Sequence, residues 1–227
     1  MIYHYPATGR PPGRDTAEVE ALKAACLQNL PVFVVTTGTP ARLRNVTRGF
    51  VADFDDRCRQ CLILFGDSPP LRKNPPDDGT FVLRQPRGRR ALASTSLNRS
   101  ASFQFAVLKR YGARCAVCDI AVAEVIDAAH LCSVDKDGSD DPRNGLPLCA
   151  THHRAFDAAL FGFKPGDLRI VSTEGGPSLR DLRITRINLA HLRALPHPEA
   201  VAWYWAHKRP RTGPILATNA VDDAGGG

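Results

Sequence analysis

The stretch NGLPLCATHHRAFD, residues 144–157, holds an Asn, a Cys, two adjacent His and an Asp. Side chains of these types bind metal ions, transfer protons or hold a loop through hydrogen bonds. A helix that only fills a hydrophobic core needs none of them. We therefore expect a functional site here, completed by residues that the rest of the chain brings to the same point.

Paired cysteines upstream are the first such residues. Cys115 and Cys118 lie in CAVC, and Cys149 and His152 repeat that spacing after a turn-rich insert. Two ligands at this spacing can hold one Zn²⁺ from a tight turn, and two such pairs complete a tetrahedral site. We predict a structural zinc site that stabilises a core too small to fold alone. His153 is the alternative to His152, because the two are adjacent and only geometry distinguishes them.

The other cysteines are predicted to be structural. The chain has 7 Cys and no apolar segment typical of a secretion signal, so we expect no disulfide framework. Cys58 and Cys61 form a second pair, CRQC, which leaves a second metal site as an alternative. They stand at the start of an apolar strand, however, where Cys often serves as a small hydrophobic residue. Cys26 and Cys132 have no partner at metal-binding spacing.

The first part of the chain is expected to form a helix and a small β-rich unit. TAEVEALKAACLQN has apolar residues at helical spacing, and the runs that follow are rich in β-branched and aromatic residues. The expected elements are a helix over 16–29, strands over 30–38, 49–55, 61–66 and 80–90, and a Pro-rich loop over 67–79. The polar segment 91–100 lacks a clear period and is predicted to be a linker.

The following segment predicts a hairpin between two helices. The expected elements are a helix over 100–112, a strand ending at His130, a long polar loop, a strand over 145–148 and a helix over 149–160. His153 and Asp157 lie four residues apart on this last helix, so they share one face. That face can meet His130 across the hairpin.

The C-terminal part ends with an aromatic, basic helix over 197–211. Trp203, Tyr204 and Trp205 are expected to pack this helix onto the rest of the protein. Contact of its basic end with nucleic acid is the alternative. The Gly-rich tail, residues 216–227, is expected to be disordered.

Taken together, these residues resemble the HNH endonucleases. The three signature positions match His130 in DAAH, Asn144 in PRNGL and His153 in CATHHRAFD. The order AAH, NGL, H and FD, with the two zinc-binding pairs, is similar to the zinc-stapled, McrA-like branch of restriction-type enzymes. The resemblance covers roughly residues 100–175 and implies a further hairpin over 161–172. It implies an α+β fold, in which an N-terminal β-rich module, PUA-like or similar, precedes a ββα-metal nuclease domain with structural zinc.

The resemblance also implies roles for residues. His130 would be the general base that takes a proton from water. His153 would bind a catalytic Mg²⁺ or Mn²⁺, with Asp157 as a second ligand or as a group that positions a water. Asn144 would hold the loop so that His130 points correctly, while a backbone carbonyl accepts from the other imidazole nitrogen and selects the tautomer.

One position departs from the family pattern. Many members carry Asp or His immediately before the base, as a metal ligand, and this chain has Ala129 there. Asp127 is the expected substitute. Three alternatives without a catalytic role stay open: His130 as a core residue, Asn144 as a turn residue before Gly, and Asp157 as a surface charge.

Basic residues point to a polyanionic partner. The formal net charge is +7 and the pI is about 9.2, which favours nucleic acid. The candidate DNA-binding residues are Arg42, Arg44, Arg48, Arg87, Arg89, Arg90 and Arg154. Because an HNH core has little sequence preference of its own, residues 1–95 are predicted to be the DNA-recognition module. By distant similarity to readers of modified cytosine, Tyr3, Tyr5, Phe33 or Phe54 would line a base pocket, with core packing as the alternative.

The sequence therefore predicts a metal-dependent DNA endonuclease of restriction type, with residues 96–215 as the nuclease domain and double-stranded DNA as substrate. Dependence on modified cytosine and assembly as a homodimer are left open. A non-catalytic zinc-containing DNA-binding protein and a phage-type nicking endonuclease are the alternatives. The chain has no apolar run long enough to span a membrane and its N-terminus lacks a signal-peptide core, so we expect a cytoplasmic protein.

Overall fold

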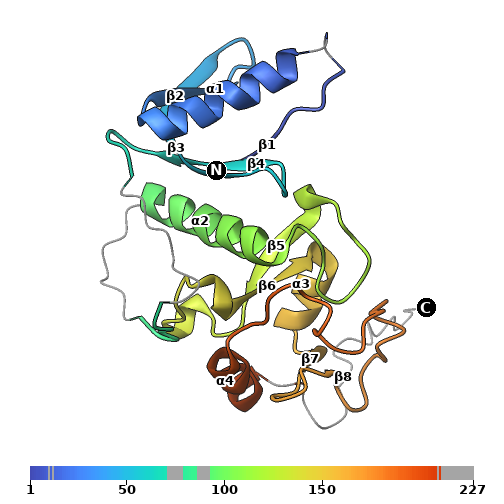
Figure 1. Cartoon of the computed structure of the whole chain (residues 1–227). Helices are drawn as coiled ribbons and strands as arrows, with labels where there is room; N and C mark the ends of the chain where they lie inside the picture. Colours follow the sequence, from blue (N-terminus) through green and yellow to red (C-terminus); the bar gives the residue numbers. More distant parts are fainter. Residues whose placement is uncertain (10, 12, 71–78, 86–92, 209, 211–227) are drawn as a thin grey trace, which may run out of the picture.

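A computed structural model describes the chain apart from residues 10, 12, 71–78, 86–92, 209 and 211–227. Two parts meet along a central helix (Figure 1). The first is a four-stranded sheet with one covering helix, and the second surrounds a β-hairpin followed by a short helix. Within the described residues, no helix combines the length and apolarity required to cross a bilayer.

The N-terminal sheet is antiparallel. Its elements are β1 (Ile2–His4), β2 (Pro31–Thr37), β3 (Arg44–Asp55) and β4 (Gln60–Phe65), in the order β1-β4-β3-β2, and α1 (Arg14–Gln28) covers one face (Figure 1). Cys26 of α1 packs on that face with Val51, Cys61 and Ile63. β4 is buried at four consecutive residues, which point to both faces of the sheet, and α2 lies against it. The expected helix and first three strands are confirmed, and β1 was not predicted.

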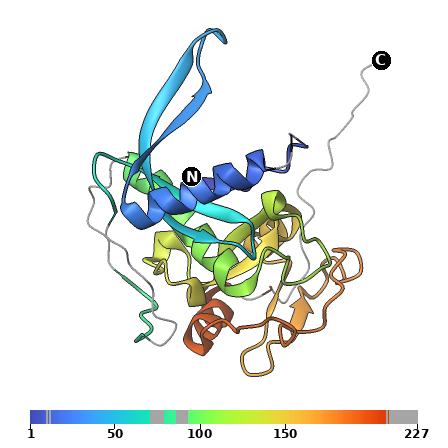
Figure 2. The ribbon, with the colours of Figure 1, turned by 45° about the horizontal axis from the view of Figure 1, so that its top comes forward.

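The β2–β3 hairpin extends beyond the rest of the sheet. β2 pairs with β3 along its whole length, from Pro31 opposite Phe50 to Thr37 opposite Arg44. β4 pairs with β3 only from Gly49 onward. Residues 44–48 therefore have β2 as their one strand partner among the described residues, and the outer part of the hairpin is a two-stranded ribbon. Figure 2 shows this ribbon projecting away from the body of the protein.

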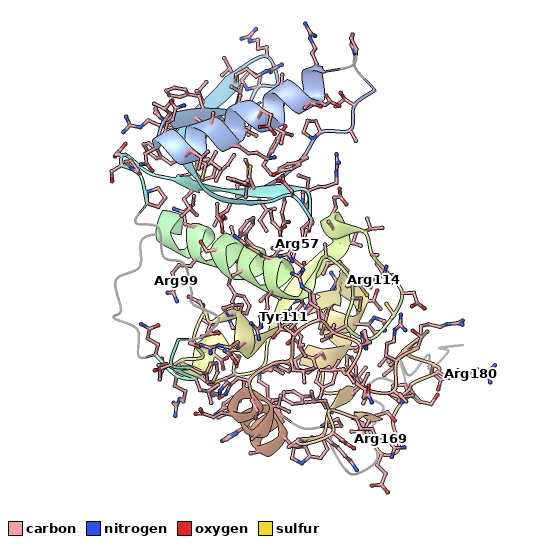
Figure 3. All side chains as sticks on the ribbon, in the orientation of Figure 1. Arg57, Arg99, Tyr111, Arg114, Arg169 and Arg180 are labelled. Atoms are coloured by element: carbon pink, nitrogen blue, oxygen red, sulfur yellow. The ribbon has the colours of Figure 1, made fainter. Side chains whose placement is uncertain are left out.

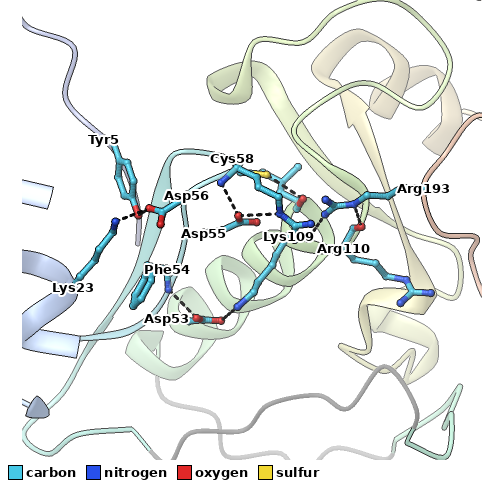
Figure 4. Close-up of polar contacts among 12 residues, drawn as sticks. Tyr5, Lys23, Asp53, Phe54, Asp55, Asp56, Cys58, Lys109, Arg110 and Arg193 are labelled. Atoms are coloured by element: carbon cyan, nitrogen blue, oxygen red, sulfur yellow. Dashed lines mark hydrogen bonds and ion pairs between the residues drawn. The ribbon is translucent and has the colours of Figure 1, made fainter. Parts of the chain in front are cut away.

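The central helix, α2 (Ala93–Tyr111), corrects the expected linker. Residues 93–100 belong to this helix, which lies against β4 on one side and against the β-hairpin of the second part on the other. The Asn98 side chain holds the C-terminal end of β4 through two hydrogen bonds. It accepts from Phe65 N at 3.2 Å and donates to Phe65 O at 2.9 Å. At the other end, Lys109 Nζ lies 2.6 Å from Asp53 Oδ2 (Figure 4).

The second part begins with a hairpin and a helix. β5 (Ile126–His130) pairs antiparallel with β6 (Gly145–Cys149), and α3 (Ala150–Asp157) follows directly. The hairpin loop contains two short 3-10 helices, η2 (Val134–Lys136) and η3 (Pro142–Asn144), while η1 (Ala123–Val125) precedes β5. The predicted order of strand, loop, strand and helix is confirmed, although α3 ends at Asp157 and not at residue 160.

A hydrophobic core supports this hairpin. β7 (Phe161–Phe163), β8 (Ile170–Ser172) and α4 (Pro198–Lys208) pack around it, as the sequence predicted for the last hairpin and helix. Tyr204 is fully buried, stacks on Phe156 with ring centroids 4.6 Å apart, and donates to Phe161 O at 3.0 Å. The predicted packing of Tyr204 is confirmed, and α4 supports α3 through its contact with Phe156.

The expected strand over 80–90 is wrong for the residues that the structure describes there. Residues 79–85 form an irregular segment with a single bridge between Arg84 and Gly138. Leu83 is buried in the core of the second part, so this segment packs beside the hairpin loop and adds no strand to the N-terminal sheet. Phe81 packs against the same core, and Val82 is exposed.

Candidate active site and metal centre

Four predicted zinc ligands come together in the second part. The ligand atoms of Cys115, Cys118, Cys149 and His152 all lie within 4.8 Å of one another, and all four residues are buried. His152 Nδ1 is 3.1 Å from Cys149 Sγ and 3.6 Å from Cys115 Sγ. The four atoms thus surround one point, as the matched spacing predicted.

Backbone hydrogen bonds place the two pairs. The turn that carries Cys115 closes through its own amide, which donates to Ile120 O at 2.8 Å. The next amide, Ala116 N, donates to Pro147 O in β6 at 2.8 Å, so the first pair is tied to the strand that ends at Cys149. Cys149 is the N-cap residue of α3, which brings His152 of the first turn to the same point.

The orientation of His152 suits a metal ligand. Its Nε2 lies 2.8 Å from Leu182 O, and because a carbonyl can only accept, this nitrogen carries the hydrogen. Nδ1 is then left with a lone pair directed at the cysteines. A ligating His typically donates its second N–H to such a partner, which fixes both the tautomer and the ring orientation.

The chemistry of the donor set fits zinc. Burial, together with the nearby Cys115, raises the pKa of Cys118 to about 12, so in this apolar setting a cation is needed to hold the thiolates. Three thiolates and one imidazole in a closed, buried site are typical of structural Zn²⁺. The predicted Cys₃His site is therefore a possible zinc centre by composition and by geometry.

The alternative pair, CRQC, does not form a second centre. Cys58 donates to Leu108 O at 3.3 Å and belongs to the core of the second part. Cys61 packs with Cys26 under α1, in a different cluster. In the described part of the chain, no other group of three or more Cys, His, Asp or Glu converges as a metal site would require.

A cleft of about 500 Å³ lies beside the hairpin. It is bounded by α2, by β5, by the hairpin loop and by α3. Its polar lining residues include His130, His153, Asp127, Asp140 and Arg99. The two predicted histidines thus face one shared space, although they come from different elements.

His130 ends β5 and rests on an aromatic platform. Its ring stacks on Phe103 of α2, with centroids 3.6 Å apart and planes at 11°. On the hairpin, Gly145 lies opposite His130, and a Cβ at Gly145 would come within 2.6 Å of the Phe103 ring. The glycine therefore permits the close approach of α2 to the hairpin. The Asn-Gly pair thus has a packing role in addition to any role in a turn.

The Nε2 atom of His130 is buried and makes no hydrogen bond. Asp140 Oδ1 lies 3.6 Å from it, a distance that suits an ion pair but is too long for a hydrogen bond. The other carboxylate oxygen, Asp140 Oδ2, accepts from Arg99 Nε at 3.1 Å and Nη2 at 2.6 Å. The resemblance implied a backbone carbonyl as acceptor for this imidazole, and the charged group that the structure places beside Nε2 is Asp140.

Asn144 is fully buried and holds the hairpin loop closed. Its side-chain oxygen accepts from Cys132 N, and its amide donates to Cys132 O and Ser139 O, each at 2.9 Å. Its backbone carbonyl accepts from Leu131 N, also at 2.9 Å. These bonds begin at the residue after His130, so they secure the end of β5 that carries the imidazole.

His153 points away from the zinc ligands. Its Nδ1 lies 3.3 Å from Asp127 Oδ2 of β5, and its Nε2 lies 3.6 Å from Asp157 Oδ2 one turn later. Asp127 and Asp157 are half-exposed and exposed, respectively, and only the first lines the cleft. Ala129, which stands where many family members carry a ligand, is fully buried in the core, whereas Asp127 lines the cleft.

The candidate DNA-binding residues divide into three groups. Arg42, Arg44 and Arg48 are exposed on the β2–β3 hairpin, and Arg154 is exposed on α3. Arg48 Nη2 lies 2.5 Å from Asp67 Oδ1. Arg87, Arg89 and Arg90 lie outside the described residues.

The candidate pocket aromatics do not share one face. Tyr3, Tyr5 and Phe54 pack in the cluster under α1, whereas Phe33 is 64% exposed on the hairpin. The core alternative holds for the first three. Phe33 lies on the opposite face of the sheet, so a pocket lined by Phe33 would be separate from one lined by the other three.

Two polar residues of the cleft were missed. Arg99 was assigned to a linker, and Asp140 belongs to a polar loop with several other carboxylates. They are 41 residues apart in the chain, and only the packing of α2 on the hairpin joins them. Figure 3 shows Arg99 on α2, on the side of the hairpin loop. No local motif could have identified this pair.

Comparison with known families agrees with this arrangement. A family model described as HNH endonuclease matches residues 115–164. The matched segment includes the four residues of the metal centre together with His130, Asn144 and His153. No curated protein matches the chain. The match indicates an HNH endonuclease domain in this segment, for which DNA is the expected substrate.

Proposed function

We propose that the protein is a metal-dependent DNA endonuclease whose phosphodiester substrate binds in the cleft between α2 and the hairpin. The observation that carries the proposal is the shared cleft itself, which joins His130 to His153 and Asp127. A protein that used zinc only to fold would need the buried Cys₃His centre and would not need these three side chains around an open space.

His130 is the general base in this proposal. Its Nε2 is buried, so Nδ1 is the nitrogen available to a water in the cleft. For Nδ1 to accept a proton, Nε2 must carry the hydrogen, and the Asp140 carboxylate favours that tautomer. Hydrogen bonds of this kind are often long in a free enzyme and shorten when substrate binds. Asp140 is thus a positioning residue.

The reaction is a hydrolysis. The water oxygen forms a bond to phosphorus as His130 Nδ1 takes a proton, and the bond from phosphorus to the leaving sugar oxygen breaks. Arg99 lines the same cleft, where its charge can meet the phosphate. Because Asp140 also holds Arg99, one carboxylate orients the base and a phosphate-binding group.

His153 and Asp127 would hold the catalytic ion. An imidazole and a carboxylate 3.3 Å apart on a half-exposed wall suit Mg²⁺ or Mn²⁺. Asp127 and Asp157 lie near opposite nitrogens of the ring, so His153 and Asp127 would hold the ion on the cleft side, with the Asp157 carboxylate near Nε2. When bound, the ion would polarise the phosphate and stabilise the leaving oxygen.

The proposed setting is restriction of foreign DNA, with the N-terminal sheet as the recognition unit. Similarity of the AAH, NGL and FD motifs to restriction-type enzymes supports this setting. The sheet is built around basic loops, and its α2 contact places it next to the cleft. Dependence on modified cytosine is the finer part of the proposal, and it is tested separately from cleavage.

The test uses matched plasmids, one unmodified and one carrying 5-methylcytosine or 5-hydroxymethylcytosine. Each is incubated with the protein and Mg²⁺, Mn²⁺ or EDTA, beside a His130→Ala variant. We expect metal-dependent cutting that the variant lacks. A preference for one plasmid would assign modification reading to the sheet, and equal cutting of both would remove that role.

Other outcomes distinguish the alternatives. Nicked circles without linear product would favour a nicking endonuclease acting as a monomer. Absence of cutting on every substrate and with every metal, while the protein still binds DNA, would overturn the proposal. That result would favour a zinc-containing DNA-binding protein.

A further inference from the structure

The outer part of the β2–β3 hairpin carries an exposed apolar face. Directly paired residues share a face, and the pairs Phe33 with Arg48, Val35 with Val46 and Thr37 with Arg44 lie on the one opposite α1. The side chains of Phe33, Val35 and Val46 are 64%, 58% and 61% exposed. Val32 and Val34 on the other face pack toward α1. Contiguous exposed apolar side chains on a projecting element usually mark a contact with a partner.

The charge on this element selects the kind of partner. Residues 30–51 contain Arg42, Arg44 and Arg48 and no acidic residue. Arg44 Nη1 donates to Ala41 O and Leu43 O at 2.7 and 2.9 Å, which holds its guanidinium at the tip. A projecting hairpin with several Arg and no carboxylate is complementary to a polyanion. A purely apolar contact with another protein would not require this excess of Arg over acidic residues.

The base of the projecting hairpin lies beside the cleft. The two-stranded part begins where Gly49 pairs with Phe65, at the end of β4. Asn98 of α2 holds that end through both hydrogen bonds to Phe65. The next residues of the helix, Arg99 and Ser100, line the cleft. A duplex cut in the cleft would therefore pass close to the projecting hairpin.

We infer that the outer β2–β3 hairpin is an arm that enters a groove of the duplex cut in the cleft. A two-stranded ribbon fits the major groove of B-DNA, and Arg side chains with apolar wedges also serve binding in the minor groove. Phe33 and Val35 contact bases or sugars, and Arg42 and Arg44 contact phosphates. The inference rests on the proposed endonuclease function, of which it names the substrate-binding element.

The experiment measures binding without cleavage. A fluorescein-labelled 30-base-pair duplex is titrated with the full chain carrying His130→Ala, in buffer without added divalent ion. Fluorescence anisotropy at several salt concentrations gives Kd and the slope of log K against log salt. Phe33→Ala is expected to raise Kd roughly tenfold, because the burial of an exposed Phe side chain is lost.

Charge is tested with a pair of double variants. Arg42→Gln with Arg44→Gln is expected to reduce the salt slope by about 2, since each phosphate contact contributes about 0.9. Arg42→Lys with Arg44→Lys keeps the charges and is expected to retain the slope. Arg180→Gln with Arg183→Gln removes the same charge from exposed positions elsewhere, and Arg180 lies far from the sheet in Figure 3. That control should leave the slope and Kd unchanged.

Three results would overturn the inference. Kd and slope equal to the parent in the Phe33 and Gln variants would remove the arm from DNA binding. So would failure of the parent protein to bind any duplex. Sedimentation velocity supplies the third: a concentration-dependent dimer that Phe33→Ala dissociates, with DNA binding unchanged, would assign the face to a second copy of the chain. Failure of the cleavage test with arm-dependent binding intact would count against the endonuclease function alone.

Discussion

His152 and His153 are adjacent in the chain, yet their imidazoles point to different places, the Cys₃His cluster and the cleft. His152 Nδ1 lies 3.1 Å from Cys149 Sγ in the buried metal centre. His153 Nδ1 lies 3.3 Å from Asp127 Oδ2 at the cleft. Successive residues on a helix point about 100° apart, so a single turn can supply both a structural and a reactive ligand. This resolves the ambiguity between the two residues.

The first prediction separates these sites. His152→Ala removes one zinc ligand, so we expect loss of bound zinc and a large fall in Tm. His153→Ala is expected to retain one Zn²⁺ per chain and a Tm near that of the parent, but to lose metal-dependent DNA cleavage. Zinc content by plasma mass spectrometry, thermal unfolding and plasmid cleavage give the three readouts. Loss of zinc from the His153 variant would reverse the assignment.

The second prediction concerns the base. His130→Ala is expected to lower the cleavage rate by about 10²–10⁴-fold, as removal of a general base typically does. His191→Ala is the matched control, because His191 is exposed and does not line the cleft. Single-turnover rates on supercoiled plasmid check both variants. A His130 variant that cleaves as fast as the control would contradict the role.

The third prediction tests Asp140 as the residue that orients His130. Asp140→Ala is expected to lower kcat about 10–100-fold, a range typical for partners that orient a reactive histidine. Asp140→Asn, which keeps an acceptor oxygen, should lose less. Both should leave zinc content and Tm close to those of the parent. Asp135→Asn, in the same loop and exposed, serves as the control. Equal kcat in all three variants would remove Asp140 from the reaction.

The fourth prediction concerns the hairpin loop. Asn144→Ala deletes three side-chain hydrogen bonds and leaves buried backbone groups of Cys132 and Ser139 without partners. The free energy of unfolding should fall by about 2–4 kcal/mol. Asn45→Ala, at an exposed position on β3, should change it by less than about 0.5 kcal/mol. Denaturant unfolding measures both. A small effect at Asn144 would mean that the loop is held by other contacts.

Sequence patterns predicted the parts of the site that depend on local spacing. The two ligand pairs, the strand that ends at His130 and the turn of α3 that carries His153 all follow from short-range geometry. The Asn144 side chain closes the loop after His130, as the resemblance implied. The choice between His152 and His153 stayed open from the sequence, because it depends on the direction of two neighbouring side chains, which the structure supplies.

The missed features depend on contacts between distant segments. Residues 93–100 are rich in Ser and Thr and have weak helical propensity, and the clamp between Asn98 and Phe65 shows how tertiary contacts stabilise α2 there. Arg99 therefore belonged to an apparent linker. Its partner Asp140 lies among other loop carboxylates, and none of them differs in type from a solvated charge.

The position of α2 has a consequence for how the two parts of the chain could be exchanged in evolution. One flank of this helix holds β4 through Asn98, and the other supplies Phe103 as the floor under His130. A chain divided at residues 95/96 would be cut within the helix. Recombination that exchanged the N-terminal sheet for another unit would thus have to carry α2 with the second part. The incoming unit would then need a strand end whose backbone N–H and C=O can form the two hydrogen bonds that Asn98 makes with Phe65. Many sheets could provide such an end.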